Sequence, residues 1–336
     1  MVFGETKNTQ KMKRSRILIP LLAMAFLFLA APNMNFNVII PAIIDVPDHI
    51  KVAAMINRTL VEDDASNVIE SVLTGELVGE DKLATQILMD GVHAMLKDAA
   101  TVSIKRTTEV YPGGSPISAA FPEPLSWEDI EALCKKYQAD AIVAIEKFDS
   151  DFIIIPGVNQ TATVKAGIRM YDPASKSIID QYQYSHQESW GSGELSIEAA
   201  INGLISKNAA VKEASYEAGI AYGRRLSPSW YRISREYFRK SKGDDVFAEG
   251  ARMMEINDWF AAKEALFQAV ENGHRKTKGK AAHNLAVVFE IEGNLEEAKV
   301  WAQAAWGKYK NKKSKDYLYD LNRRINETAR ANEQMN

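Results

Sequence analysis

Apolar and polar residues alternate with two different periods between residues 51 and 226. A period of two, or a short continuous apolar run, is typical of a strand, whereas apolar residues three and four positions apart are typical of a helix. These patterns predict strands at Lys51–Asn57, Thr101–Thr107, Asp140–Phe148, Thr161–Tyr171 and Ser177–His186. They predict helices at Asp81–Lys97, from Ser126 onward, and at Ser196–Arg225.

The resulting order, β-α-β-α-β-β-β-α, predicts an α/β domain with a mixed sheet over residues 51–226. The connections between the first three strands are long enough for parallel pairing. The last two strands flank Asp172-Pro173-Ala174-Ser175, a turn sequence that favours an antiparallel hairpin. Glu62–Gly79 and the proline- and glycine-rich Tyr111–Pro124 are expected to be loops.

Residues 244–336 have a helical pattern throughout. Small residues at Ala286 and Ala298, with Gly293 between them, resemble the helix–turn–helix spacing of a tetratricopeptide repeat. A weaker copy precedes this repeat, and Asp316–Ala331 is expected to form a helix that caps the open end. The sequence therefore predicts an α/β domain followed, after a connecting segment at 227–243, by tetratricopeptide-like helices.

The N-terminus has the pattern of an export signal. The apolar run Ile17–Ala31 follows several cations, which are Lys7, Lys11, Lys13, Arg14 and Arg16. Basic residues followed by about 15 apolar ones are typical of a signal peptide, whereas a spanning helix needs about 20. The residues near Ala31 make a poor cleavage site, so residues 1–31 are interpreted as a signal peptide or an uncleaved signal anchor. Residues 32–50, which contain several prolines, are expected to be an extended lead-in.

Composition and charge argue against several classes of function. The net charge is −3, so a strongly basic, nucleic-acid-binding protein is not expected. The single cysteine, Cys134, excludes an internal disulfide and a cysteine-based zinc site. Its position on the apolar side of a predicted helix indicates a buried core residue.

No catalytic motif emerges from the sequence. The five histidines are scattered, and neither a nucleophile elbow nor a phosphate-binding glycine loop is present. Glu146, Asp149 and Asp151 are the most suggestive acidic group, because paired carboxylates can exchange protons or hold a cation. A solvated edge at the end of a strand explains them as well, and this interpretation is favoured. We therefore expect no catalytic residue, no metal, no cofactor and no enzymatic activity.

Two sets of residues are candidates for a partner-binding surface. The aromatic candidates in the predicted repeats are Trp259, Phe289 and Trp301. The basic candidates are Arg232, Arg235 and Arg239, which belong to a stretch where arginines and lysines alternate with aromatic residues. Contact with an acidic surface, anionic lipid or glycan, or salt bridges between domains, explains that stretch better than nucleic-acid binding does.

Several ordered motifs carry a family resemblance. They are Pro41–Pro47, Trp127–Asp151, Arg169–Pro173, Ser227–Trp230 and Asn284–Ala286. Together they resemble a family of Bacteroidota cell-envelope proteins, catalogued as a domain of unknown function with a tetratricopeptide tail. The resemblance implies an envelope location but no reaction, and the missing lipid-acceptor cysteine puts lipidation in doubt. The element order also resembles the periplasmic domains of the curli secretion lipoprotein and the N-terminal domain of TolB, at the level of fold only.

These observations predict a non-catalytic, exported protein that is periplasmic or held at the membrane by its N-terminal segment. It is expected to act as an adaptor or assembly factor and to bind a protein or peptide partner through its repeats. A subunit of an envelope secretion or transport assembly is one alternative. A metal-dependent enzyme centred on Glu146, Asp149 and Asp151 is the other.

Overall fold

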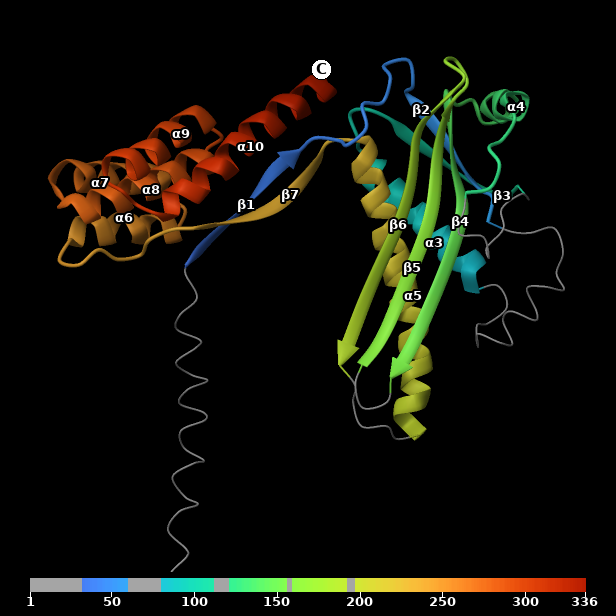
Figure 1. The fold of residues 1–336 in the computed structure, drawn as a ribbon, viewed down its shortest axis with the longest axis horizontal. Coiled ribbons are helices and arrows are strands. Elements are labelled where there is room, and N and C mark those ends of the chain that lie inside the picture. Colours follow the sequence, from blue (N-terminus) through green and yellow to red (C-terminus); the bar gives the residue numbers. More distant parts are fainter. Residues whose placement is uncertain (1–31, 60–79, 112–120, 156–158, 192–196) are drawn as a thin grey trace, which may run out of the picture. The chain divides into compact units, whose positions relative to one another are not determined.

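The computed structural model describes residues 32–59, 80–111, 121–155, 159–191 and 197–336 (Figure 1). The chain divides into two compact units. The helical unit contains the described residues up to Val38 and residues 231–327, and the sheet unit contains residues 39–230 and 328–336. No helix in the described ranges is long and apolar enough to cross a membrane.

The sheet unit is built on a five-stranded mixed sheet in the order β3-β2-β4-β5-β6. Its strands are β2 (Val52–Asn57), β3 (Ser103–Val110), β4 (Ala141–Ile155), β5 (Asn159–Asp172) and β6 (Ser177–Gly191). Strand β2 lies between β3 and β4 and runs parallel to both, whereas β4, β5 and β6 pair antiparallel. The predicted mixed sheet, its parallel first strands and its terminal hairpin are therefore confirmed.

Helices cover both faces of this sheet. Helices α3 (Glu80–Leu96) and α5 (Ile197–Leu226) lie on one face, where Met55 and Val143 belong to their core (Figure 1). Helix α4 (Trp127–Tyr137) covers the other face and packs on Ile56. Neighbouring residues of a strand point to opposite faces, so β2, which is apolar from Val52 to Ile56, serves both cores.

Glycines allow α3 and α5 to approach each other closely. A Cβ atom added to Gly91 would lie 2.2 Å from the backbone oxygen of Tyr216. One added to Gly219 would lie 2.0 Å from the backbone oxygen of Leu88. These separations are too short for any side chain, so the helix pair requires glycine at both positions.

Helix α4 begins where its sequence predicts. The Ser126 hydroxyl accepts a hydrogen bond from the Asp129 backbone N–H at 3.1 Å, which caps the first turn. Gln138 ends the helix in the left-handed conformation, with φ of 49°. Cys134 is buried, as expected, and burial raises the pKa of its thiol to about 11.

Helices α6 to α10 make up most of the helical unit. They are α6 (Asp245–Glu255), α7 (Trp259–Asn272), α8 (Arg275–Ile291), α9 (Leu295–Gln303), a π-helical turn (Ala304–Lys308) and α10 (Lys313–Met335). The last residues of α10, from Thr328, belong to the sheet unit. Asp244, Asp258 and Asn294 accept hydrogen bonds from the first turns of α6, α7 and α9. The helical region from residue 244 is therefore confirmed.

Three features differ from the prediction. The lead-in 32–50 contains a strand, β1 (Asn33–Ile40), and the connecting segment 227–243 contains β7 (Ser229–Glu236). These two strands form a sheet of their own. Strand β4 runs to Ile155 rather than ending at Phe148, because its second half continues to pair with β5. The expected loop at Glu62–Gly79 and most of the one at Tyr111–Pro124 lie outside the described residues.

Candidate functional site

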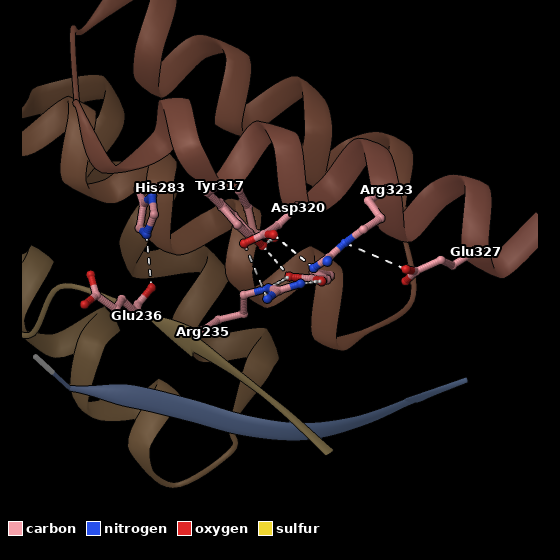
Figure 2. Close-up of polar contacts among 9 residues, drawn as sticks. Arg235, Glu236, His283, Tyr317, Asp320, Arg323 and Glu327 are labelled. Atoms are coloured by element: carbon pink, nitrogen blue, oxygen red, sulfur yellow. Dashed lines mark hydrogen bonds and ion pairs between the residues drawn. The ribbon is translucent and has the colours of Figure 1, made fainter. Parts of the chain in front are cut away.

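The end of β7 and the two residues that follow it lie against α8 and α10 in the helical unit (Figure 2). It is held by three buried polar residues of α8, which are His283, Asn284 and Glu290. Asparagine and histidine are weak helix formers, and a buried carboxylate is costly without partners. Their presence inside one helix is explained by the contacts that they make with residues 235–238.

Asn284 binds the backbone of Phe238 at two points. Its Oδ1 accepts a hydrogen bond from the Phe238 N–H at 2.8 Å, and its Nδ2 donates to the Phe238 carbonyl at 2.7 Å. The amide oxygen and nitrogen are assigned from this bonding pattern. The contact recognises the peptide backbone and is independent of the side chain at position 238.

Glu290 binds the side chain of Arg235. The Nε and Nη2 atoms of Arg235 each donate to the Glu290 carboxylate at 2.9 Å, a two-point ion pair. The Tyr317 hydroxyl donates to the same carboxylate at 2.6 Å, and Asp320 lies 3.7 Å from Arg235 (Figure 2). Burial lowers the pKa of Arg235, but its bonds to Glu290 outweigh this effect and raise the pKa overall. The guanidinium therefore stays charged within this cluster.

His283 binds the backbone of Glu236 in its neutral form. Its Nε2 lies 3.0 Å from the Glu236 carbonyl (Figure 2), which can only accept, so Nε2 carries the proton. Its Nδ1 then accepts from the Ser314 hydroxyl at 2.9 Å. Burial lowers the pKa of His283 to about 4, although the bond to Glu236 acts in the opposite direction. Together these contacts hold an extended peptide segment by its backbone and by one arginine.

The three basic candidates differ in the contacts that they make. Arg235 is buried in its pair with Glu290, and Arg239 pairs with Glu255 at 2.7 Å. Arg232 is exposed on β7. Two of the three arginines therefore form salt bridges within the helical unit, whereas the sequence suggested contact with an acidic surface, anionic lipid or glycan, or salt bridges between domains.

The aromatic candidates are half-buried on the helical core. Phe267 was not among them, yet its ring centroid lies 5.3 Å from that of Trp301 and 6.4 Å from that of Phe289. Lys263 lies over the Phe289 ring at 5.3 Å and pairs with Glu292 at 2.6 Å. We call Phe260, Phe267, Phe289 and Trp301 the aromatic face. Phe260 is included because it lies seven positions before Phe267 on α7. Seven positions are nearly two helical turns, so the two residues lie on the same side of the helix.

Glu146 and Asp149, two of the three acidic candidates, make separate contacts. Glu146 is fully buried, and its carboxylate contacts Arg58 and Tyr171, both at 2.5 Å. Burial raises the pKa of Glu146, although these partners oppose the shift. Asp149 faces Lys165 at 2.9 Å, and the Asp151 side chain lies outside the described residues.

The favoured interpretation placed the three acids on a solvated edge at the end of a strand, and it is wrong in two respects. Glu146 is buried, and none of the three acids lies at the end of its strand. Glu146 lies in a buried ion-pair network, and β4 continues beyond residue 151. Arg169, 3.8 Å from Glu146, also donates to the Pro122 carbonyl at 2.6 Å. The network thus fastens the segment before α4 to the sheet. No group of histidine, cysteine or acidic residues able to hold a metal occurs in the described parts of the chain.

A second amide contact occurs in the sheet unit. The Gln334 side chain accepts from the Ala42 N–H at 2.8 Å and donates to the Ala42 carbonyl at 3.1 Å. Hydrogen bonds from Gln334 and Arg330 lower the pKa of Asp45. A cavity of about 700 Å³ lies beside this contact and is lined by acidic, basic and apolar residues together.

Two known families together match most of the described chain. A family described as "Domain of unknown function (DUF8603)" matches residues 50–238, more than half of the chain. The chain belongs to the DUF8603 family. A second family, described as "Domain of unknown function (DUF6340)", matches residues 248–327. The DUF8603 match ends at Phe238, the residue whose backbone Asn284 binds.

Solved structures with low similarity to this DUF8603 protein come from bacterial proteins. The PelC dodecamer of Paraburkholderia phytofirmans has 10% identity and a TM-score of 0.26, covering 58% of this chain and 99% of that one. A minor lipoprotein of Acinetobacter baumannii has 6% identity and a TM-score of 0.28, covering 55% and 98%. A hypothetical protein of Chlamydia trachomatis has 15% identity and a TM-score of 0.29, covering 52% and 96%. Similarity at this level does not transfer a function. No curated protein matches the chain.

Proposed function

We propose that this DUF8603 protein is a non-catalytic adaptor or assembly factor of the cell envelope, and that it binds a protein partner through the aromatic face of its helical unit. The observation that supports this proposal is the exposure of aromatic rings on that face. Phe260 is 79% exposed, and Phe289 and Trp301 of the same aromatic face are partly exposed. Aromatic residues surrounded by polar ones are enriched where protein interfaces gain most of their binding energy.

The arrangement of the helices supports a binding role for this unit. Helix α6 packs on α7, α7 on α8, and α8 on α9, with buried small residues such as Ala262, Ala286 and Ala298 where they meet. We propose that these pairs are tetratricopeptide-like repeats, a class that presents extended binding surfaces. The surface of α8 that holds residues 235–238 is already filled by the chain itself, which leaves the aromatic face for a partner.

The envelope location rests on the N-terminal sequence. Cations precede the apolar run Ile17–Ala31, as in a signal peptide or a signal anchor. Fractionation of cells that express the full chain tests this part. Recovery with membranes or periplasm is expected, and recovery in the cytosol would contradict it.

The adaptor role is tested by crosslinking in cells, followed by purification of the full chain and identification of the captured proteins. Phe260→Glu places a charge on the aromatic face and is expected to abolish capture of the specific partner. Tyr319→Glu is the matched control, because Tyr319 is also an exposed aromatic residue of the helical unit, at 69%, but lies on α10. Equal capture by both variants would exclude the aromatic face.

A further inference from the structure

Three segments of the helical unit are strongly basic. They are residues 239–242 (RKSK), 275–280 (RKTKGK) and 308–315 (KYKNKKSK). They hold three, four and five lysines or arginines, and none contains an aspartate or glutamate. The whole chain has a net charge of −3, so this concentration of positive charge is a local feature. We call these segments together the basic cluster.

Hydrogen bonds bring the three segments together. The Lys280 side chain donates to the Lys240 carbonyl at 2.5 Å, and the Ser241 and Thr277 hydroxyls lie 2.7 Å apart. Asn311 donates to the Gly279 carbonyl at 2.9 Å. Residues distant in the sequence therefore form one basic surface at one end of the unit.

Aromatic rings lie among these cations. The ammonium groups of Lys280 and Lys313 lie 5.5 and 5.6 Å from the centre of the Phe238 ring. Lys315 lies 6.0 Å from the centre of the Trp306 ring, and Trp306 is 37% exposed. Aromatic and basic residues in this combination are typical of surfaces that lie at a membrane interface.

Few of these charges are neutralised within the protein. Within the described chain, Arg239 pairs with Glu255 and Lys313 with Glu236, and the other cations of the basic cluster form no ion pair. Burial, and the neighbouring charge of Lys276, lower the pKa of Lys280. The surface therefore favours an external anion.

The N-terminal segment enters the helical unit at the same end. The Pro32 carbonyl accepts a hydrogen bond from the Tyr237 N–H at 3.0 Å, next to Phe238. The apolar run Ile17–Ala31 ends at the residue before Pro32. If that run is held in a bilayer, no spacer separates it from the basic cluster.

We propose that the basic cluster docks on a membrane surface rich in anionic phospholipid, beside the point where the N-terminal segment enters the bilayer. This proposal rests on the envelope location proposed above. Clustered lysines and arginines bind anionic headgroups by summed electrostatic attraction, which salt weakens. The proposal favours lipid over nucleic acid because the adjacent run Ile17–Ala31 is apolar and belongs to the predicted export signal.

The test uses the full chain in lipid nanodiscs and measures hydrogen–deuterium exchange. Discs of phosphatidylcholine are compared with discs that contain about 30% phosphatidylglycerol. Exchange of amides in 239–242 and 308–315 is expected to slow by about threefold or more in the anionic discs, and high salt of about 0.5 M is expected to remove the effect. Equal exchange in the two kinds of disc would overturn the proposal.

Two variants with the same change of charge complete the test. Lys310→Gln, Lys312→Gln and Lys315→Gln together are expected to abolish the protection. Arg232→Gln, Arg252→Gln and Arg323→Gln together remove three exposed cations elsewhere in the unit and are expected to retain it. Stronger protection by a DNA or RNA oligonucleotide than by anionic lipid would also overturn the proposal. A cytosolic location in the fractionation would instead contradict the proposed function, so the two failures are distinguishable.

Discussion

The side chain of Asn284 satisfies both backbone hydrogen-bonding groups of Phe238, 46 positions earlier in the chain. A carboxamide presents a donor and an acceptor side by side, which matches the two groups of one residue in an extended chain. Asn284 therefore takes the place that a neighbouring strand would occupy. The contact joins the end of the β7 segment to α8 without depending on the Phe238 ring.

Replacing this amide should destabilise the helical unit. Asn284→Ala leaves the part-buried N–H and carbonyl of Phe238 without the amide that binds them, which we expect to lower the free energy of unfolding by about 1–3 kcal/mol. Asn322→Ala is the control, because Asn322 is an exposed asparagine of α10 and its replacement favours the helix slightly. Urea denaturation measures both. A loss no greater than that of the control would show that the contact contributes little.

Replacing one partner of the Arg235–Glu290 pair should destabilise the protein more than replacing both partners together. Arg235→Met leaves the Glu290 carboxylate buried beside Tyr317 without its cation, and we expect a loss of about 3–5 kcal/mol. The double variant Arg235→Met, Glu290→Leu removes both charges and should recover part of that loss. Denaturation of the wild type, both single variants and the double variant measures the coupling. Additive effects of the two changes would argue against a coupled pair.

The stability of the helical unit should fall in mild acid because of His283. Its pKa is about 4 in the folded protein, below the ordinary value of 6.5, so the unfolded chain binds the proton more readily. This contribution is complete above pH 6.5 and is lost progressively as the pH falls toward 4. The total is about 3 kcal/mol as an order of magnitude. His283→Gln removes the titrating group and should show a weaker dependence on pH than the wild type when unfolding is compared at pH 7 and pH 4.5.

The close approach of α3 and α5 should not tolerate a side chain. Gly91→Ala places a methyl group 2.2 Å from the Tyr216 backbone oxygen, so the helices must separate. We expect a loss of about 2 kcal/mol or more. Gly307→Ala is the control, because a Cβ there has no neighbour within 4 Å and φ is not positive. A thermal melt that shows equal stability for the two variants would contradict the tight crossing.

The sheet and most of the helices could be predicted because their residues follow simple burial patterns. Strand β2 is apolar on both faces, and α4 carries a capping serine before its buried stripe. Strand β7 was missed because most of its residues are exposed, and of the two half-buried positions in its second half, Ile233 and Arg235, only one is apolar. The second half of β4 was missed for a related reason, since polar residues interrupt the apolar run.

The contacts of α8 could not be predicted from residue types. Asn284 was noticed as part of a repeat motif, but its partner is a backbone group distant in the sequence. Glu290 and His283 carry no spacing motif, and only the fold brings them to Arg235 and Glu236. The aromatic residues Phe289 and Trp301 were named from the predicted repeats, whereas Phe267 was not, because only the fold shows that its ring lies near both of theirs.

The burial of Glu290 determines where the gene can be divided. A fragment that begins between the two family matches, after Phe238 and before α6, would keep the helices but lack Arg235, Glu236 and Phe238. Glu290, His283 and Asn284 would then lose the groups that they bind, and such a fragment should express poorly. A boundary before Tyr231 retains all three of those groups, so most of β7 has to stay with the helices.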